Sequence, residues 1–133
     1  MPQSKIGIMN ESLQVLYVED NADVRELVSM LLADEGLCVV GCATAEAAEA
    51  AFALQPFDIL ITDVSLPSML GTELAKRLQR SNTDLWVVFC SGYPMQQGLA
   101  AWGPRARSLP KPFESEELHT LLQEIRSVNA RCA

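Results

Sequence analysis

The feature of this sequence that most constrains its fold is an alternation between short apolar runs and segments with helical periodicity. The run at 85–90 is apolar at all six positions. Runs of this kind are typical of strands that are buried on both faces. Strands that alternate with helices form a parallel sheet with helices on both sides. We therefore expect an α/β fold with five strands, at 13–18, 37–42, 57–62, 85–90 and 106–109.

Five expected helices lie between and after these strands. In the first, Asn21 is a suitable N-cap and Gly36 a suitable end. The fourth, at 95–102, is expected to be short or irregular because Gly98 disfavours a helix. The second follows Thr44 and runs to about Leu54, and the last covers 114–128. Helical spacing predicts that the inner faces carry Val24, Leu27, Val28, Leu31 and Leu32 in the first helix, Leu70, Leu74, Ala75 and Leu78 in the third, and Leu118, Leu121, Leu122 and Ile125 in the last.

Polar side chains follow four of the five strands. Ligands bind beyond the carboxyl ends of parallel strands, so these groups are expected to share one crevice. Close carboxylates repel one another unless a cation lies between them, and hard oxygen ligands suit Mg²⁺. A carboxylate can also be a nucleophile toward phosphorus, with an ammonium and a hydroxyl binding the phosphoryl oxygens. The residues concerned are Glu19 and Asp20 after the first strand, Asp63 after the third, Ser91 after the fourth, and Lys111 after the fifth.

Each of these residues also has a purely structural interpretation. An acid pair at a strand–helix junction is often a helix cap, Asp63 can be a turn residue, and Ser-Gly is a common turn pair. Lys111 is more specific, because it stands between Pro110 and Pro112, and this rigid frame fixes where its side chain points. The prediction of a phosphoryl-transfer site therefore rests on the whole set.

The motifs around these residues resemble those of two-component response regulator receiver domains. The resemblance is carried by VLYVEDN, DILITDVSLPSMLG, VVFCSG and LPKPF. It implies a flavodoxin-like, doubly wound parallel sheet with strand order 2-1-3-4-5. The domain would cover 13–128, with a flexible leader at 1–12 and a tail at 129–133. It could be a stand-alone regulator or the receiver of a longer protein, such as a hybrid histidine kinase.

The resemblance also implies a role for each residue. Asp63 would be the phosphoacceptor, and the donor would be a phosphohistidine on a sensor histidine kinase or a histidine phosphotransfer protein. Such a domain is a signalling switch rather than an enzyme, since it catalyses only its own phosphorylation and dephosphorylation. Mg²⁺ would be the cofactor, bound by Asp20 and Asp63, by Glu19 through water, and by the main-chain carbonyl of Ser65. The phosphoryl group would be contacted by Ser91 and Lys111.

The sequence departs from the family pattern at three places. Ser108 stands where an aromatic residue is common, Leu70 stands where an acid or amide is common, and the segment between Ser91 and Lys111 is short and rich in glycine. We therefore expect the signal to be displayed between 92 and 104, with Tyr93 and Trp102 as exposed contacts. The alternative for Trp102 is that it packs on the sheet. A degenerate receiver that no longer cycles phosphate is also possible, although the intact residue set argues against it.

Composition narrows the class of partner. The net charge is −7, from 17 acidic and 10 basic residues, and no basic cluster is present, which argues against nucleic acid binding. No apolar stretch approaches the length of a membrane span, so no membrane contact is expected. The cysteines form no CxxC pair, which favours a cytoplasmic protein without disulfides. We expect a monomer or a weak dimer. Cys38, Cys42 and Cys90 are interpreted as small buried hydrophobic residues, and His119 as solvated.

Two other chemistries that occur with this fold class need features that this sequence lacks. A phosphohydrolase of the haloacid dehalogenase type would need a second acid two residues after the nucleophile, where this chain has Ser65, and a cap domain. A flavin-binding domain would need a Ser/Thr-rich phosphate loop, and the sequence contains none.

Overall fold

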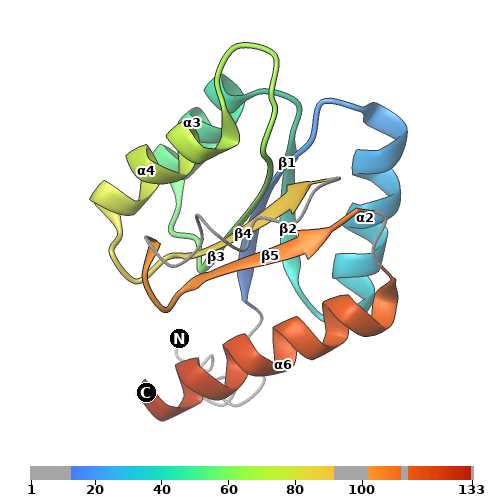
Figure 1. The fold of residues 1–133 in the computed structure, drawn as a ribbon, viewed down its shortest axis with the longest axis vertical. Helices are drawn as coiled ribbons and strands as arrows, with labels where there is room; N and C mark the ends of the chain where they lie inside the picture. Colours follow the sequence, from blue (N-terminus) through green and yellow to red (C-terminus); the bar gives the residue numbers. More distant parts are fainter. Residues whose placement is uncertain (1–12, 92–101, 112–113, 133) are drawn as a thin grey trace.

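The structure, a computed structural model, describes residues 13–91, 102–111 and 114–132. Its centre is a sheet of five strands in the order β2-β1-β3-β4-β5, and all neighbouring strands are parallel (Figure 1). The expected α/β fold and strand order are therefore confirmed. The strands are β1 (Gln14–Val18), β2 (Cys38–Cys42), β3 (Ile59–Asp63), β4 (Trp86–Ser91) and β5 (Ala106–Pro110).

Helices cover both faces of the sheet, with α3 and α4 on one side and α2 and α6 on the other (Figure 1). The helices in the described ranges are α2 (Ala22–Asp34), α3 (Ala45–Leu54), α4 (Gly71–Ser81) and α6 (Ser115–Cys132). The expected leader at 1–12, the expected fourth helix at 95–102 apart from its last residue, and Tyr93 lie outside the described residues. None of the described helices combines the length and apolarity that a membrane crossing needs.

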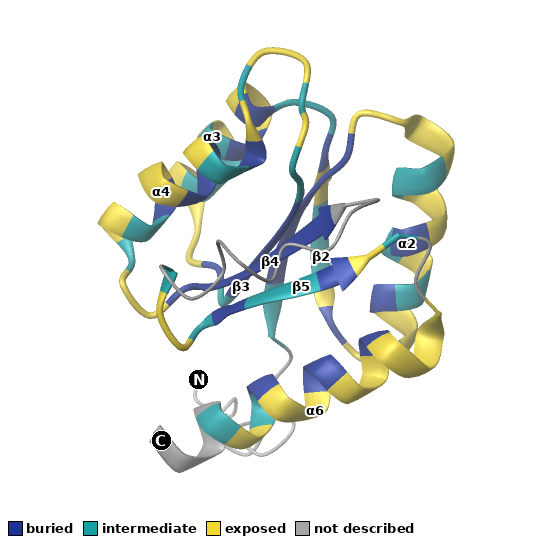
Figure 2. Ribbon diagram, viewed as in Figure 1, coloured by how far each residue is buried: buried dark blue, intermediate teal, exposed yellow. Residues whose placement is uncertain are grey.

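Two apolar clusters, one on each face of the sheet, form the core (Figure 2). Successive residues of a strand point to opposite faces, so the three central strands, β1, β3 and β4, contribute buried residues to both clusters. In β1, Val15 and Tyr17 face α2 and α6, whereas Leu16 and Val18 face α3 and α4. The central strands are thus buried on both faces, as their apolar runs predicted, whereas the edge strands β2 and β5 are partly exposed.

Strand limits differ from the predictions by one or two residues. Phe57 is buried but precedes β3, because its ring stacks on Phe52 at a centroid distance of 6.1 Å instead of joining the strand. Asp63 and Ser91 are the last residues of β3 and β4 rather than the first residues after them. The helix α6 continues to Cys132, past the expected end at 128.

Three residues that were expected to be buried are exposed. Leu27 is 59% exposed, since it lies about 100° around α2 from Val28, which faces the sheet. Leu70 is 56% exposed and precedes α4 in an extended conformation, so it is not part of that helix's inner face. Cys38 is exposed at the start of β2, which is an edge strand, while Cys42 and Cys90 are buried as expected.

His119 has a contact that its position on the sequence did not predict. It is exposed on α6, but its Nδ1 lies 2.7 Å from Oε1 of Glu35, the C-cap residue of α2. It therefore links α6 to α2 rather than being only solvated.

Candidate functional site

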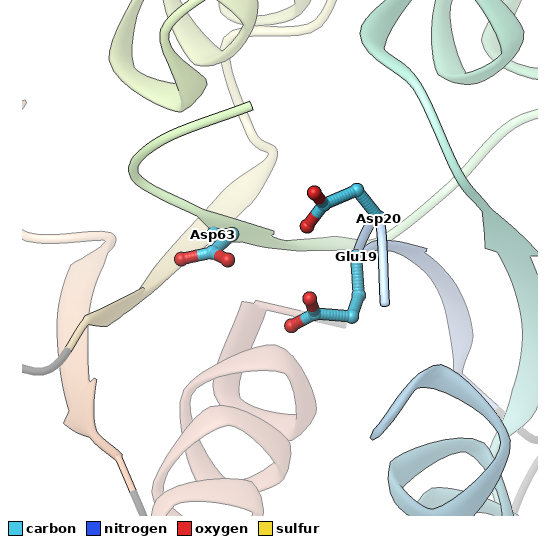
Figure 3. A group of neighbouring side chains, drawn as sticks. All are labelled: Glu19, Asp20 and Asp63. Atoms are coloured by element: carbon cyan, nitrogen blue, oxygen red, sulfur yellow. The ribbon is translucent and has the colours of Figure 1, made fainter. Parts of the chain in front are cut away.

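Three carboxylates meet at the carboxyl ends of β1 and β3. One oxygen from each of Glu19, Asp20 and Asp63 lies within 4.8 Å of the others. Figure 3 shows Glu19 and Asp20 leaving the end of β1 toward Asp63 on the neighbouring strand. Glu19 is buried, Asp63 is partly buried and Asp20 is exposed. The acid pair and Asp63 therefore lie together, as their positions after two strands predicted.

The turn between β1 and α2 holds Glu19 in place. Its N–H donates to the carbonyl of Cys42 on β2 at 2.9 Å, and its Oε2 accepts from the N–H of Asn21 at 3.1 Å. Asn21 is the N-cap of α2, because its Oδ1 accepts from the N–H of Val24 at 3.0 Å. The acid pair is thus part of the turn that joins β1 to the capped helix α2, and it also contributes two carboxylates to the cluster.

Lys111 brings a positive charge into the cluster. Its Nζ lies 2.8 Å from Glu19 Oε1 and 3.0 Å from Asp63 Oδ2. Burial of the ammonium lowers its pKa, but the hydrogen bonds it donates to Glu19 and Asp63 outweigh burial, and the pKa of Lys111 lies above its ordinary value. Lys111 is therefore charged at neutral pH and offsets part of the repulsion among the acids.

The loop after Asp63 is closed tightly against the main chain of the strand. The N–H of Gly71 donates to the carbonyl of Val64 at 2.7 Å, and Ser65 forms an isolated bridge with Leu70. A Cβ at Gly71 would lie 1.9 Å from the carbonyl oxygen of Asp63, so no side chain fits there. Gly71 is the last residue of the motif DILITDVSLPSMLG. Only the structure shows why a glycine is needed there, because it lies against the main chain of Asp63.

Residues 15–123 match the response regulator receiver domain family. The chain belongs to this family and is a receiver domain of a two-component system. It is 31% identical over 107 residues to Response regulator receiver protein CpdR of Brucella abortus, covering 79% of this chain and 89% of CpdR. It is 33% identical over 122 residues to Sensor kinase CckA of the same organism, covering 88% of this chain but 13% of the kinase.

The solved structures agree with the sequence relatives. The chemotaxis protein CheY4 of Vibrio cholerae is 29% identical and has a TM-score of 0.78, with 86% of this chain and 99% of CheY4 covered. The curated relatives include both a short protein of similar length and a kinase many times longer.

The main chain of Ser91 lies at the end of β4, next to the strand ends that carry Asp63 and Lys111. It ends β4 and is paired in register with Pro110, the residue before Lys111. Its neighbour Cys90 is paired with Asp63. The strand ends that carry Asp63, Ser91 and Lys111 are thus adjacent, as predicted, while the side chain of Ser91 lies outside the described part of the structure.

Tyr17 and Cys90 were not predicted as neighbours of the site. Both are buried in the core cluster on the α2 and α6 side; Tyr17 stands two residues before Glu19 in the chain, and Cys90 is paired in register with Asp63. Burial raises the pKa of the Cys90 thiol to about 12, and it also raises the pKa of Tyr17. Both side chains are therefore neutral at physiological pH.

An aromatic contact lies next to Ser108, between Trp102 and Phe89. Ser108 is paired in register with Phe89 on β4. The ring of Trp102 packs edge-to-face on Phe89 with centroids 5.1 Å apart, and Trp102 is partly buried against the core cluster on the α3 and α4 side. Trp102 thus packs on the sheet, which is the second of the two alternatives that the sequence left open for this residue.

Proposed function

We propose that this receiver domain accepts a phosphoryl group on Asp63 from a phosphohistidine donor, in a reaction that needs Mg²⁺. The observation that supports this most strongly is the position of Asp63, whose carboxylate lies beside an acid pair and 3.0 Å from the ammonium of Lys111. A structural turn residue would have no need of that arrangement. It suits a nucleophile that must approach an anionic group.

The donor set fits Mg²⁺, which takes hard oxygen ligands and typically one or two protein carboxylates. Both oxygens of Glu19 already accept hydrogen bonds, from Lys111 and from the N–H of Asn21, which suits a role through water. Asp20 is exposed and therefore accessible for direct binding. We assign Asp20, Asp63 and the main-chain carbonyl of Ser65 as direct ligands. When bound, Mg²⁺ supplies positive charge that offsets the charge of the transferring group.

In the phosphoryl transfer, Asp63 is the nucleophile, and Lys111 and Ser91 bind the phosphoryl oxygens. A carboxylate oxygen of Asp63 forms a bond to phosphorus while the bond from phosphorus to the donor imidazole nitrogen breaks, and the imidazole leaves with that electron pair. Lys111 binds a phosphoryl oxygen and remains protonated, since its pKa is raised. Ser91 donates a hydrogen bond to another phosphoryl oxygen. The product is an aspartyl phosphate, which water can hydrolyse.

The outer face of α2 is the surface on which we expect the donor protein to dock. Leu27 and Met30 are both 59% exposed there, one helical turn apart. Their helix begins at Ala22, two residues after Asp20, so this apolar pair lies on the element adjoining the acids. A sensor histidine kinase or a histidine phosphotransfer protein that reaches Asp63 can contact it at the same time.

The test of phosphorylation uses a small phosphodonor, so that it does not depend on the identity of the kinase. The protein is incubated with acetyl phosphate and Mg²⁺, and its intact mass is measured. We expect one added phosphoryl group in the wild type and none in Asp63→Asn or without Mg²⁺. A phosphoryl group that persists in Asp63→Asn would show that Asp63 is not the acceptor, and a wild type that never gains one would favour a degenerate receiver.

A further inference from the structure

Arg25 contacts the acid pair from a direction that none of the motifs indicates. It lies in the first turns of α2, and its Nη1 donates a hydrogen bond to the main-chain oxygen of Glu19 at 2.8 Å. Its aliphatic stem lies over Gly41 of β2, where a Cβ would be 3.5 Å from Cγ and Cδ of Arg25. The side chain therefore spans from the helix across the edge strand to the end of β1.

The oxygen that Arg25 contacts belongs to the peptide unit that joins the two acids. That peptide unit is planar, so the carbonyl of Glu19 and the N–H of Asp20 lie in one plane and can only turn together. Strand pairing between β1 and β3 ends one residue earlier, at Val18 and Thr62. A hydrogen bond from a charged donor is stronger and shorter than one between neutral groups. Arg25 therefore fixes the peptide plane from which the side chains of Glu19 and Asp20 depart.

We propose that Arg25 is a positioning residue of the site, which orients the carboxylates of Glu19 and Asp20 for a divalent cation by holding the peptide between them. The proposal rests on the proposed function, because it concerns the affinity of the same site for Mg²⁺. Groups that orient metal ligands typically change metal affinity by about 10- to 100-fold when they are removed.

The charge of Arg25 and its hydrogen bond have opposite effects on the affinity of the site for Mg²⁺. The direction of the change in a variant therefore shows which effect dominates. A guanidinium near an anionic site repels Mg²⁺, so removal of the charge alone would tighten binding. Arg25 is only partly buried, so water and salt screen that repulsion. Loss of the hydrogen bond frees the peptide plane and should weaken binding. If Arg25 acts mainly through its charge, its removal should raise the Mg²⁺ affinity. If it acts mainly by holding the peptide plane, its removal should lower that affinity.

The experiment compares Arg25→Met with Arg126→Met, a control that the chain itself offers. Arg126 also donates to a glutamate main-chain oxygen, that of Glu35 at 2.6 Å, but at the far end of α2. Mg²⁺ is titrated into each folded protein while amide resonances are followed by NMR, and urea unfolding is measured in parallel. The ¹⁵N shift of Asp20 without metal is a second readout, because its N–H belongs to the peptide that Arg25 holds.

We expect Arg25→Met to bind Mg²⁺ about tenfold more weakly and to shift the Asp20 amide, and Arg126→Met to lose stability with unchanged Mg²⁺ affinity. Equal or tighter Mg²⁺ binding by Arg25→Met would overturn the proposal, as would an equal loss of affinity in both variants. A wild type that binds no Mg²⁺ would instead contradict the proposed function, so the two failures are distinguishable.

Discussion

Lys111 Nζ lies 3.0 Å from Asp63 Oδ2, although 48 residues separate the two in the chain, and it lies 2.8 Å from Glu19, which is 92 residues away. These contacts exist only when β5, β4, β3 and β1 are aligned in one sheet, because each residue stands at the end of a different strand. The ion pairs therefore depend on the complete fold and report on it.

The raised pKa of Lys111 predicts how these ion pairs depend on pH. A cation whose pKa is raised on folding contributes stability below its unfolded value, here 10.5, and the contribution is lost as pH rises through the folded value. Lys111→Met should lower the free energy of unfolding by about 2 kcal/mol at pH 7. Urea unfolding from pH 7 to pH 11 should show the difference from wild type shrinking above pH 10.5. A constant difference would contradict the ion-pair explanation.

The sequence was enough to predict the fold and the meeting of Glu19, Asp20, Asp63 and Lys111. Each of these residues stands at or shortly after the end of an expected strand, and parallel strands bring such ends to one edge. The exposure of Leu27 and Cys38 was not predictable, because both stand at the border of an apolar pattern, where neighbouring elements decide burial.

Gly71 and Arg25 show a second limit of the sequence. The 1.9 Å approach of a Gly71 Cβ to the oxygen of Asp63 and the hydrogen bond of Arg25 to Glu19 involve main-chain atoms. Main-chain atoms are the same for every residue type, so their contacts leave little trace in a single sequence. Such partners become visible only when the chain is folded.

Gly71→Ala should disturb both stability and the phosphoacceptor. The new methyl group overlaps the carbonyl oxygen of Asp63, so the strand end or the start of α4 must move. We expect a loss of about 2 kcal/mol in the free energy of unfolding and slower phosphorylation by acetyl phosphate. Gly41→Ala is the matched control, since its Cβ would make ordinary contacts at 3.5 Å. Equal effects of the two substitutions would argue against a steric requirement at Gly71.

The apolar pair on α2 should matter for a protein donor and not for a small one. Leu27→Ala with Met30→Ala removes exposed side chains, so the free energy of unfolding should change little. Phosphotransfer from a cognate kinase or phosphotransfer protein should slow by about tenfold or more, while the rate with acetyl phosphate stays the same. Leu54→Ala is the control, because Leu54 is 86% exposed at the end of α3. A similar loss in the control would refute a specific docking role for α2.

The three cysteines of the sheet, Cys38, Cys42 and Cys90, should differ in reactivity. Cys38 is exposed, whereas burial raises the pKa of the thiols of Cys42 and Cys90, the latter to about 12. Thiolates are the reactive form, so a thiol reagent at pH 8 should modify Cys38 much faster than either buried thiol. Peptide mapping after brief labelling measures the order. Early labelling of Cys90 would show that the sheet beneath the site opens readily.

The contact between Trp102 and Phe89 predicts an optical signal for the switch. Phe89 stands two residues before Ser91 in β4, so a movement of the strand end should change the surroundings of the Trp102 ring. We expect beryllium fluoride with Mg²⁺ to change the tryptophan emission of the wild type. The change should vanish in Trp102→Leu, which keeps only the buried Trp86 at the start of β4. Loss of the aromatic contact should also cost about 1 kcal/mol of unfolding free energy. If the emission change persists in Trp102→Leu, the signal does not pass through this aromatic pair.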